Sequence, residues 1–169
     1  MIAQHYLDES VFQLRKLKGQ ADKAMAQIDD AQFFTRLDAD SNSIAIIVKH
    51  VAGNMRSRWT DFLASDGEKP DRDRDSEFER EHGDTRDAVL ARWEAGWEVL
   101  FSTLTTLQPN DLGKTVAIRG EPHTVVQAIN RQLSHYASHV GQIVLLAKHF
   151  AGPGWQTLSI PKKNRRIGE

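Results

Sequence analysis

TVVQAINRQLSHYASHVGQIVLLAKH, residues 124–149, is the stretch that decides the fold. Its apolar side chains recur every three or four positions, which is the period of one face of an α-helix. Thr124 and Gln127 form the capping-box pattern of a helix N-terminus, and AGPG at 151–154 ends the periodic run. The apolar stripe consists of Val125, Ile129, Leu133, Tyr136, Val140, Val144 and Ala147. We therefore expect one long amphipathic helix that buries this stripe.

Three further segments carry the same helical period, at residues 7–28, 44–62 and 89–107. Their stripes consist of Leu7, Val11, Leu14, Lys18, Ala21, Met25 and Ile28; of Ile44, Val48, Val51, Met55, Trp59 and Phe62; and of Val89, Trp93, Gly96, Trp97, Leu100, Leu104 and Leu107. DSNS at 40–43 supplies caps for the second helix, and Asp84 is the expected N-cap of the third. The four stripes predict an all-α protein folded as a four-helix bundle.

The connections between the helices refine this topology. Residues 65–83, SDGEKPDRDRDSEFEREHG, form a charged linker that is long for adjacent helices. It suits a crossover along the bundle, so we expect an order other than simple up-down-up-down. Residues 114–124 alternate apolar and polar side chains around an Arg-Gly pair, which predicts a short hairpin or extended loop. We expect one bundle over residues 1–160 and a basic C-terminal tail at 161–169.

Charge and composition restrict the class of protein. The 169 residues include 22 basic and 23 acidic side chains, for a formal net charge of −1. Such a chain lacks the broad positive field that nucleic-acid binding usually needs. The absence of cysteine excludes disulfides and thiolate metal ligands and fits a reducing compartment. No apolar stretch approaches the roughly 20 residues of a membrane span, and no signal-peptide pattern is present. We expect a cytoplasmic protein that binds neither nucleic acid nor membrane.

Three of the seven histidines can meet. His135 and His139 are four residues apart, so they project from the same face of their helix. His50 follows IAIIVK in the most apolar helix. Two imidazoles at this spacing, with a third from a facing helix, would bind one divalent ion and leave positions open for water or substrate, as in catalytic zinc sites. Each histidine could instead be a buried side chain bonded to a carbonyl group, and the sequence leaves both interpretations open.

Other catalytic motifs fit this chain less well. The zinc-protease motif needs Glu directly after its first His, where this chain has Tyr136. A di-iron bundle needs Glu-x-x-His, and Gln132 stands at that spacing before His135. An internal acid or base near the histidines would favour catalysis, but none is evident, because Asp61 lies well along its helix and Glu121 lies in a loop.

Two stretches of the chain resemble a known family. They are residues 43–78, SIAIIVKHVAGNMRSRWTDFLASDGEKPDRDRDSEF, and residues 129–161, which contain INRQLSHYASHVGQIVLLAKH and WQTLSIP. They resemble the DinB/YfiT-like superfamily of metalloenzymes, and more closely a branch of it known only as a domain of unknown function. The resemblance runs over nearly the whole chain and leaves the final KKNRRIGE outside.

The resemblance implies a four-helix bundle of up-down-down-up order. It implies a metal site made of His50, His135 and His139, with zinc, nickel or another divalent ion as the cofactor. It also implies a homodimer and a small-molecule substrate. Members of known activity are transferases or isomerases that use a low-molecular-weight thiol such as bacillithiol, mycothiol or glutathione.

Four polar residues near these histidines are candidates for substrate binding. Asn54 and Gln142 could lie behind the metal ligands or against the substrate. Arg58 and Arg131 could hold a carboxylate through paired hydrogen bonds. Each of the four could also be an ordinary polar or salt-bridged residue. We expect the DRDRD sequence at 71–75 to be a solvated loop, and the tryptophans to lie in the core or in a dimer contact.

The interpretation that we favour is a metal-dependent enzyme, a thiol transferase or a hydrolase, whose three-histidine site activates a thiol or water. The alternative is a non-catalytic helical bundle that binds a metal or a small ligand as a sensor or scaffold. The sequence alone does not decide between them, and it does not name the metal, the thiol or the electrophile.

Overall fold

The computed structural model describes residues 2–160, and this part of the chain is mostly helical. Its α-helices are α1 (Ile2–Met25), α2 (Asp30–Phe34), α3 (Ile44–Trp59), α4 (Arg86–Thr106) and α5 (Val125–Ala151). The remaining elements are the short 3-10 helices η1 (Ser76–Phe78), η2 (Pro109–Asp111) and η3 (Gly152–Gly154) and the strands β1 (Thr115–Ile118) and β2 (Glu121–Thr124). The predicted helical character and the short hairpin are confirmed. The predicted basic tail at 161–169 lies outside the described residues.

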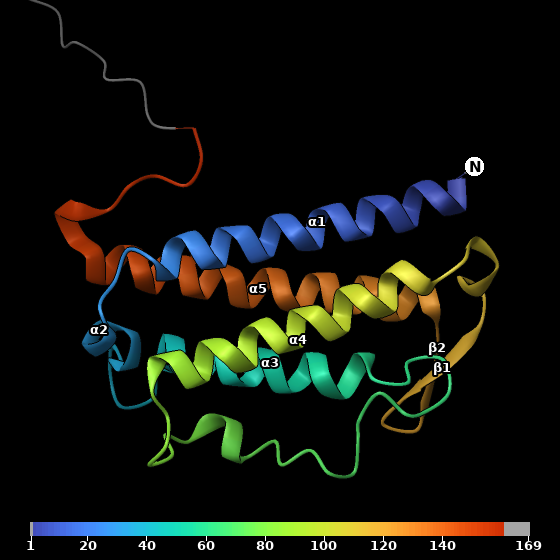
Figure 1. Ribbon diagram of the computed structural model, residues 1–169, viewed down its shortest axis with the longest axis horizontal. Helices are drawn as coiled ribbons and strands as arrows, with labels where there is room; N and C mark the ends of the chain where they lie inside the picture. The colour runs from blue at the N-terminus through green and yellow to red at the C-terminus, as the bar shows by residue number, and fades with distance from the viewer. Residues whose placement is uncertain (1, 161–169) are drawn as a thin grey trace, which may run out of the picture.

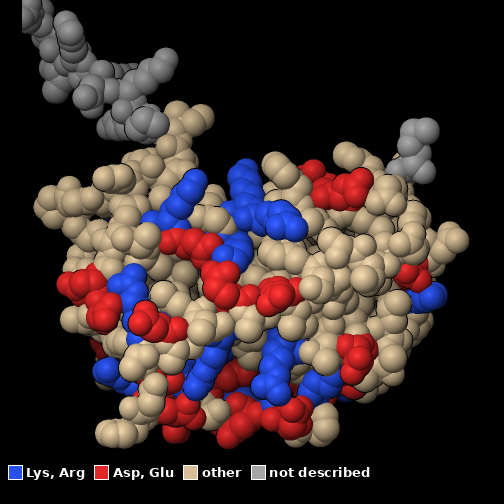
Figure 2. All heavy atoms as spheres, in the orientation of Figure 1, with Lys and Arg blue, Asp and Glu red and all other residues tan. Residues whose placement is uncertain are grey.

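The four long helices pack along one another, with α1 against α5 and α3 against α4 (Figure 1). α3 and α4 run in the same direction, and α1 and α5 run in the opposite one (Figure 1). Residues 60–85 connect the parallel pair by returning past α3, and η1 within them packs against that helix. Within residues 2–160, no helix combines the length and apolarity that crossing a membrane requires. Figure 2 shows acidic and basic side chains intermixed on the face seen in Figure 1.

The core between the helices contains most of the predicted apolar stripes. Its largest inaccessible side chains include Trp59, Trp93, Trp97 and Tyr136. Gly96 lets α4 approach α3 closely, because a Cβ at this position would lie 3.2 Å from the Cα of Ala52. The tryptophans of α3 and α4 therefore lie in the core and are not available for a dimer contact. The homodimer itself stays a prediction.

The C-terminal end of α3 differs from the prediction. The apolar stripe indicated a helix as far as Phe62, but α3 ends at Trp59. Thr60 is extended and Asp61 has a positive φ of 48°, so the chain turns away from the helix axis. Phe62 is nevertheless buried, which explains why its position fitted the stripe.

The N-cap of α4 is Thr85 and not Asp84. The Thr85 hydroxyl accepts a hydrogen bond from the backbone N–H of Ala88. Asp84 instead accepts a hydrogen bond from Lys49 Nζ at 2.7 Å, and both of these side chains are buried. This ion pair fastens the end of the 60–85 segment to α3. The predicted capping box at the start of α5, by contrast, is confirmed.

The hairpin is fastened to the beginning of the same segment. Arg119 and Gly120 at its turn have φ of 57° and 75°, as a two-residue type I′ turn requires. Their backbone N–H groups donate to the Asp66 carboxylate at 2.9 and 2.7 Å. The 60–85 segment is therefore held at one end by the hairpin and at the other by α3.

A buried polar chain joins α3 to α5. Trp59 Nε1 donates to the Tyr136 hydroxyl at 3.0 Å, and that hydroxyl donates to Asn54 Oδ1 at 3.0 Å. Burial raises the pKa of Tyr136, so the hydroxyl stays protonated and can donate. Each polar group in this chain thus has a partner inside the core.

Replacing Tyr136 by Phe should lower the free energy of unfolding by about 1–3 kcal/mol, because the Trp59 indole and the Asn54 amide lose a buried partner. Urea unfolding followed by circular dichroism measures the change. Tyr6→Phe is the control, since the Tyr6 hydroxyl is only partly buried and bonds Asn130 at 2.8 Å. We expect a smaller loss in the control, and equal losses would contradict the importance of the buried chain.

Candidate metal centre

Three imidazole rings converge where α3 faces α5. Nε2 of His135 lies 3.3 Å from Nε2 of His50 and 3.1 Å from Nε2 of His139. Nitrogen ligands at roughly 2.0–2.1 Å from a tetrahedral ion lie about 3.3 Å from one another. The separations therefore fit three nitrogens around one divalent ion. His50 is buried, whereas His135 and His139 are half-buried, so one side of the cluster faces solvent.

Hydrogen bonds at the far ring nitrogens set the tautomers of two of these rings. His50 Nδ1 lies 2.9 Å from Oε2 of Glu77, and His139 Nδ1 lies 2.8 Å from Oε1 of Gln142. Because both oxygens are acceptors, each Nδ1 carries the proton and each Nε2 presents a lone pair. This is the arrangement found behind metal-binding histidines, and imidazole nitrogens bind several divalent ions.

Glu77 is a candidate functional residue that the sequence did not reveal. It lies in η1, within the charged linker, and its side chain is only 9% exposed. Arg72 Nε and Nη2 donate to its two oxygens at 2.8 Å each. The prediction that 71–75 is a solvated loop is wrong for Arg72, whose side chain is 5% exposed. An internal acid is therefore present at His50, contrary to the sequence interpretation.

Gly53 makes room for this carboxylate. It follows His50 by three residues on α3, and a Cβ at Gly53 would overlap Oε1 of Glu77. An isolated glycine within a helical pattern often marks a close approach of another group. This glycine is the signal that could have indicated a buried partner for α3, although it does not say which residue supplies it.

The pKa values of the site favour neutral rings beside an ionised carboxylate. Burial, with His139 and His50 close by, lowers the pKa of His135 to about 3. Burial also lowers the pKa of His139. Burial alone would raise the pKa of Glu77, but the hydrogen bonds from His50 and Arg72 outweigh it, and the pKa is lowered. His135 and His139 are thus in the unprotonated form that binds metals.

Two of the predicted substrate-binding residues have protein partners instead. Asn54 is buried and accepts the hydrogen bond from Tyr136, so its Oδ1 serves the core. Gln142 accepts the hydrogen bond from His139 and thereby orients a metal ligand. Gln142 therefore lies behind His139, whereas the partner of Asn54 is Tyr136.

The two predicted arginines differ from each other. Arg131 is exposed on α5. Arg58 is 3% exposed, and its Nη2 lies 3.8 Å from Oε2 of Glu68. Nε and Nη1 of Arg58 have no hydrogen-bond partner among the described residues. Arg58 is thus a buried charge with incomplete pairing.

Residues 1–164 match the family described as "Protein of unknown function (DUF1572)". Since the match covers nearly the whole sequence, the chain belongs to this family. No curated protein and no solved structure matches the chain.

Replacing Gly53 by Ala should weaken zinc binding by about 10–100-fold, because the added methyl group displaces Glu77 from His50 and a ligating histidine loses its partner. Competition with a chromophoric chelator measures the affinity. Gly141→Ala on α5 is the matched control, since a Cβ there meets nothing within 4 Å. The control should bind zinc normally and gain about 0.5–1 kcal/mol of stability. Equal zinc affinities in the two variants would exclude this role for Glu77.

Metal-free protein should lose stability as the pH falls from 7 to 5. The pKa of His135 is about 3 in the folded chain against an ordinary value of 6.5, so the unfolded chain takes up a proton that the folded chain refuses. This contribution to stability is present above pH 6.5 and is lost progressively toward pH 3. Carboxylates titrate mainly below about pH 5, so the interval from 5 to 7 reports the histidines.

Urea unfolding at pH 7, 6 and 5 tests this dependence. The His135→Gln variant should show a shallower decline because the titrating ring has been removed. A decline as steep as that of the unchanged chain would assign the effect to other groups.

Proposed function

We propose that this member of the DUF1572 family is a metal-dependent enzyme, in which His50, His135 and His139 hold a divalent ion, zinc or nickel, that activates a low-molecular-weight thiol for transfer. The same proposal includes the DinB-like four-helix fold of up-down-down-up order. The opposite directions of the α1/α5 and α3/α4 pairs support that order (Figure 1).

The observation that carries the proposal is the convergence of three Nε2 atoms. Two of the three rings are also held in orientation by a hydrogen bond at Nδ1. Separations of 3.1 and 3.3 Å between these ring nitrogens leave little room for anything but a shared proton or a shared ion. Carboxylate and amide partners at Nδ1 favour lone pairs on Nε2 and therefore an ion. Partial exposure of His135 and His139 leaves a side on which a small molecule can approach.

The protein side chains at the site favour a substrate that supplies its own acidic proton. Both oxygens of Glu77 are engaged by Arg72, and one also accepts from His50, so this carboxylate positions His50 and is not free to take a proton from substrate. A divalent ion bound by the histidines would lower the pKa of a thiol from its ordinary value of about 8.5 and so supply the thiolate without a protein base.

The second candidate function is a non-catalytic bundle that binds a metal or small ligand as a sensor or scaffold. The engagement of Glu77 favours it as well, because no other carboxylate among the described residues contacts the three histidines. A small-molecule substrate, a homodimer and a cytoplasmic location are further parts of the enzyme proposal.

Elemental analysis of protein purified without an affinity tag tests metal binding. We expect one zinc or nickel ion per chain, and a sharp loss of that ion in His135→Ala at unchanged helicity. His149→Ala is the control, because His149 is exposed on α5 and outside the cluster. Equal metal retention in the two variants would contradict the assignment.

Activity is tested by supplying the metal-loaded chain with glutathione, bacillithiol or mycothiol and a panel of electrophiles. Thiol transfer should be faster than with His135→Ala for at least one thiol. Rates equal to those of the variant across all three thiols, in protein that retains its ion, would favour the sensor or scaffold.

A further inference from the structure

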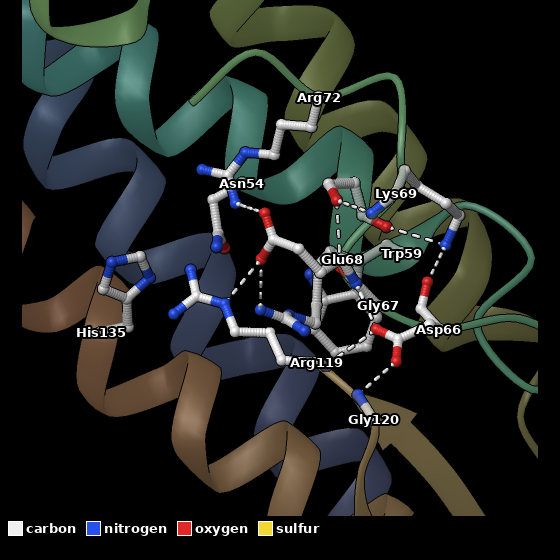
Figure 3. A network of polar contacts seen from close by, with 12 residues as sticks. Asn54, Trp59, Asp66, Gly67, Glu68, Lys69, Arg72, Arg119, Gly120 and His135 are labelled. Atoms are coloured by element: carbon white, nitrogen blue, oxygen red, sulfur yellow. Dashed lines mark hydrogen bonds and ion pairs between the residues drawn. The ribbon is translucent and has the colours of Figure 1, made fainter. Parts of the chain in front are cut away.

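Arg119 lies at the hairpin turn, and its side chain extends toward the side of the histidine cluster on which His135 lies (Figure 3). Figure 3 shows its guanidinium group between Glu68 and the ring of His135. Its Nε donates to Oε2 of Glu68 at 3.1 Å, and its side chain is 55% exposed. Within residues 2–160 its two terminal nitrogens form no hydrogen bond. Two charged donors are therefore available at the edge of the site.

Arginine is not the residue that this turn prefers. The first position of a type I′ turn requires a positive φ, which favours Asn, Asp or Gly, and a Cβ makes that conformation unfavourable. Arg119 nevertheless has a φ of 57°, and Asp66 holds the turn through two backbone hydrogen bonds. An arginine kept at an unfavourable but firmly anchored position indicates that its guanidinium group is used.

The negative charge around Arg119 is shared with other arginines. Glu68 contacts the guanidinium groups of Arg119 at 3.1 Å, Arg72 at 3.1 Å and Arg58 at 3.8 Å. Arg72 also pairs with Glu77. Arg58 and Arg119 are thus left with one carboxylate between them, and they approach the same oxygen of it.

Arg58 contributes positive charge from the interior of the protein, on the same oxygen of Glu68 that Arg119 contacts. It is 3% exposed, and its Nε and Nη1 find no partner in the described part of the chain. Burial lowers the pKa of Arg58, and the opposing effect of the nearby Glu68 does not cancel it. A buried guanidinium with unpaired donors is unfavourable unless a further anion compensates it.

We propose that Arg119 and Arg58 form an anion subsite beside the three histidines, for a small ligand that carries a carboxylate or phosphate group. Arg119 contacts the anion through its two terminal nitrogens, in the planar fork that matches such groups. Arg58 supplies a fixed positive charge behind it. The existence of the subsite does not depend on the proposed function. Only the identification of the anion as the acidic group of a thiol, or of the molecule that accepts the thiol, rests on that function.

Titration of the metal-free, full-length chain with succinate or inorganic phosphate tests the subsite. Ionic strength is held constant with sodium chloride, and the side-chain Nε–H signals of arginine are followed by NMR. We expect saturable shifts at Arg119 and Arg58 with succinate, phosphate or both, and none with added chloride alone. The tighter ligand identifies the group recognised. Because neither metal nor thiol is present, the result is independent of metal binding and catalysis.

Three variants sharpen the test. Arg119→Asn removes the guanidinium group and suits the turn, so the fold should be retained while affinity falls about tenfold or more. Arg36→Asn removes the same charge from an exposed residue outside the cluster and should bind normally. Glu68→Gln removes the carboxylate that competes with the ligand and should bind the anion more tightly.

Any one of three results would overturn the proposal. Succinate and phosphate could act no differently from chloride, or Arg119→Asn could bind as well as Arg36→Asn. Weaker anion binding by a Glu68→Gln variant with an unchanged circular dichroism spectrum would also contradict it, because a subsite that competes with Glu68 must gain from its loss.

Discussion

The hydrogen bond between Glu77 and His50 joins two parts of the chain that have no sequence pattern in common. His50 belongs to the most apolar helix, and Glu77 belongs to the most charged connection. The connection is long because α3 and α4 run in the same direction, so the chain must return along the bundle before α4 begins (Figure 1). This return path covers the back of His50. The segment that the topology requires is therefore also the segment that completes the site.

Three contacts hold that segment in place along its length. Asp66 binds the hairpin turn at its beginning, Glu77 binds His50 in its middle, and Asp84 binds Lys49 at its end. The Asp84 and Glu77 contacts are buried, where breaking one member of an ion pair or hydrogen-bonded pair is strongly destabilising. The position of the hairpin, and with it Arg119, thus depends on the same segment as the orientation of His50.

The charges around the site fit a cation and an anion bound together. Three neutral imidazoles leave the full charge of a divalent ion uncompensated, and Glu77 is already neutralised by Arg72. The guanidinium groups of Arg58 and Arg119 would repel that ion, and the repulsion is stronger for the buried Arg58 than it would be in water. The surplus positive charge is compensated when the ligand is an anion. A neutral ligand would leave the ion without a counter-charge and Arg119 with only the carboxylate of Glu68, which it shares with Arg58 and Arg72.

The sequence predicts the residues that share a helix face, but not their partners from elsewhere in the chain. His135 and His139 could be paired because helix geometry fixes residues four apart, and His50 could be added because it interrupts an apolar helix. The same spacing places Asn54 and Arg58 in line with His50 on α3, yet their partners come from α5 and from the charged linker. That linker holds eight acidic side chains (SDGEKPDRDRDSEFEREHG). The buried Glu77 belongs to the same alternating acidic run at 71–81 as its solvated neighbours, so nothing in the pattern distinguished it. Gly53 was the one local sign, since a glycine in an apolar helix removes a side chain where another group must fit. Such a vacancy indicates that something packs there, and only the path of the chain in three dimensions determines what does.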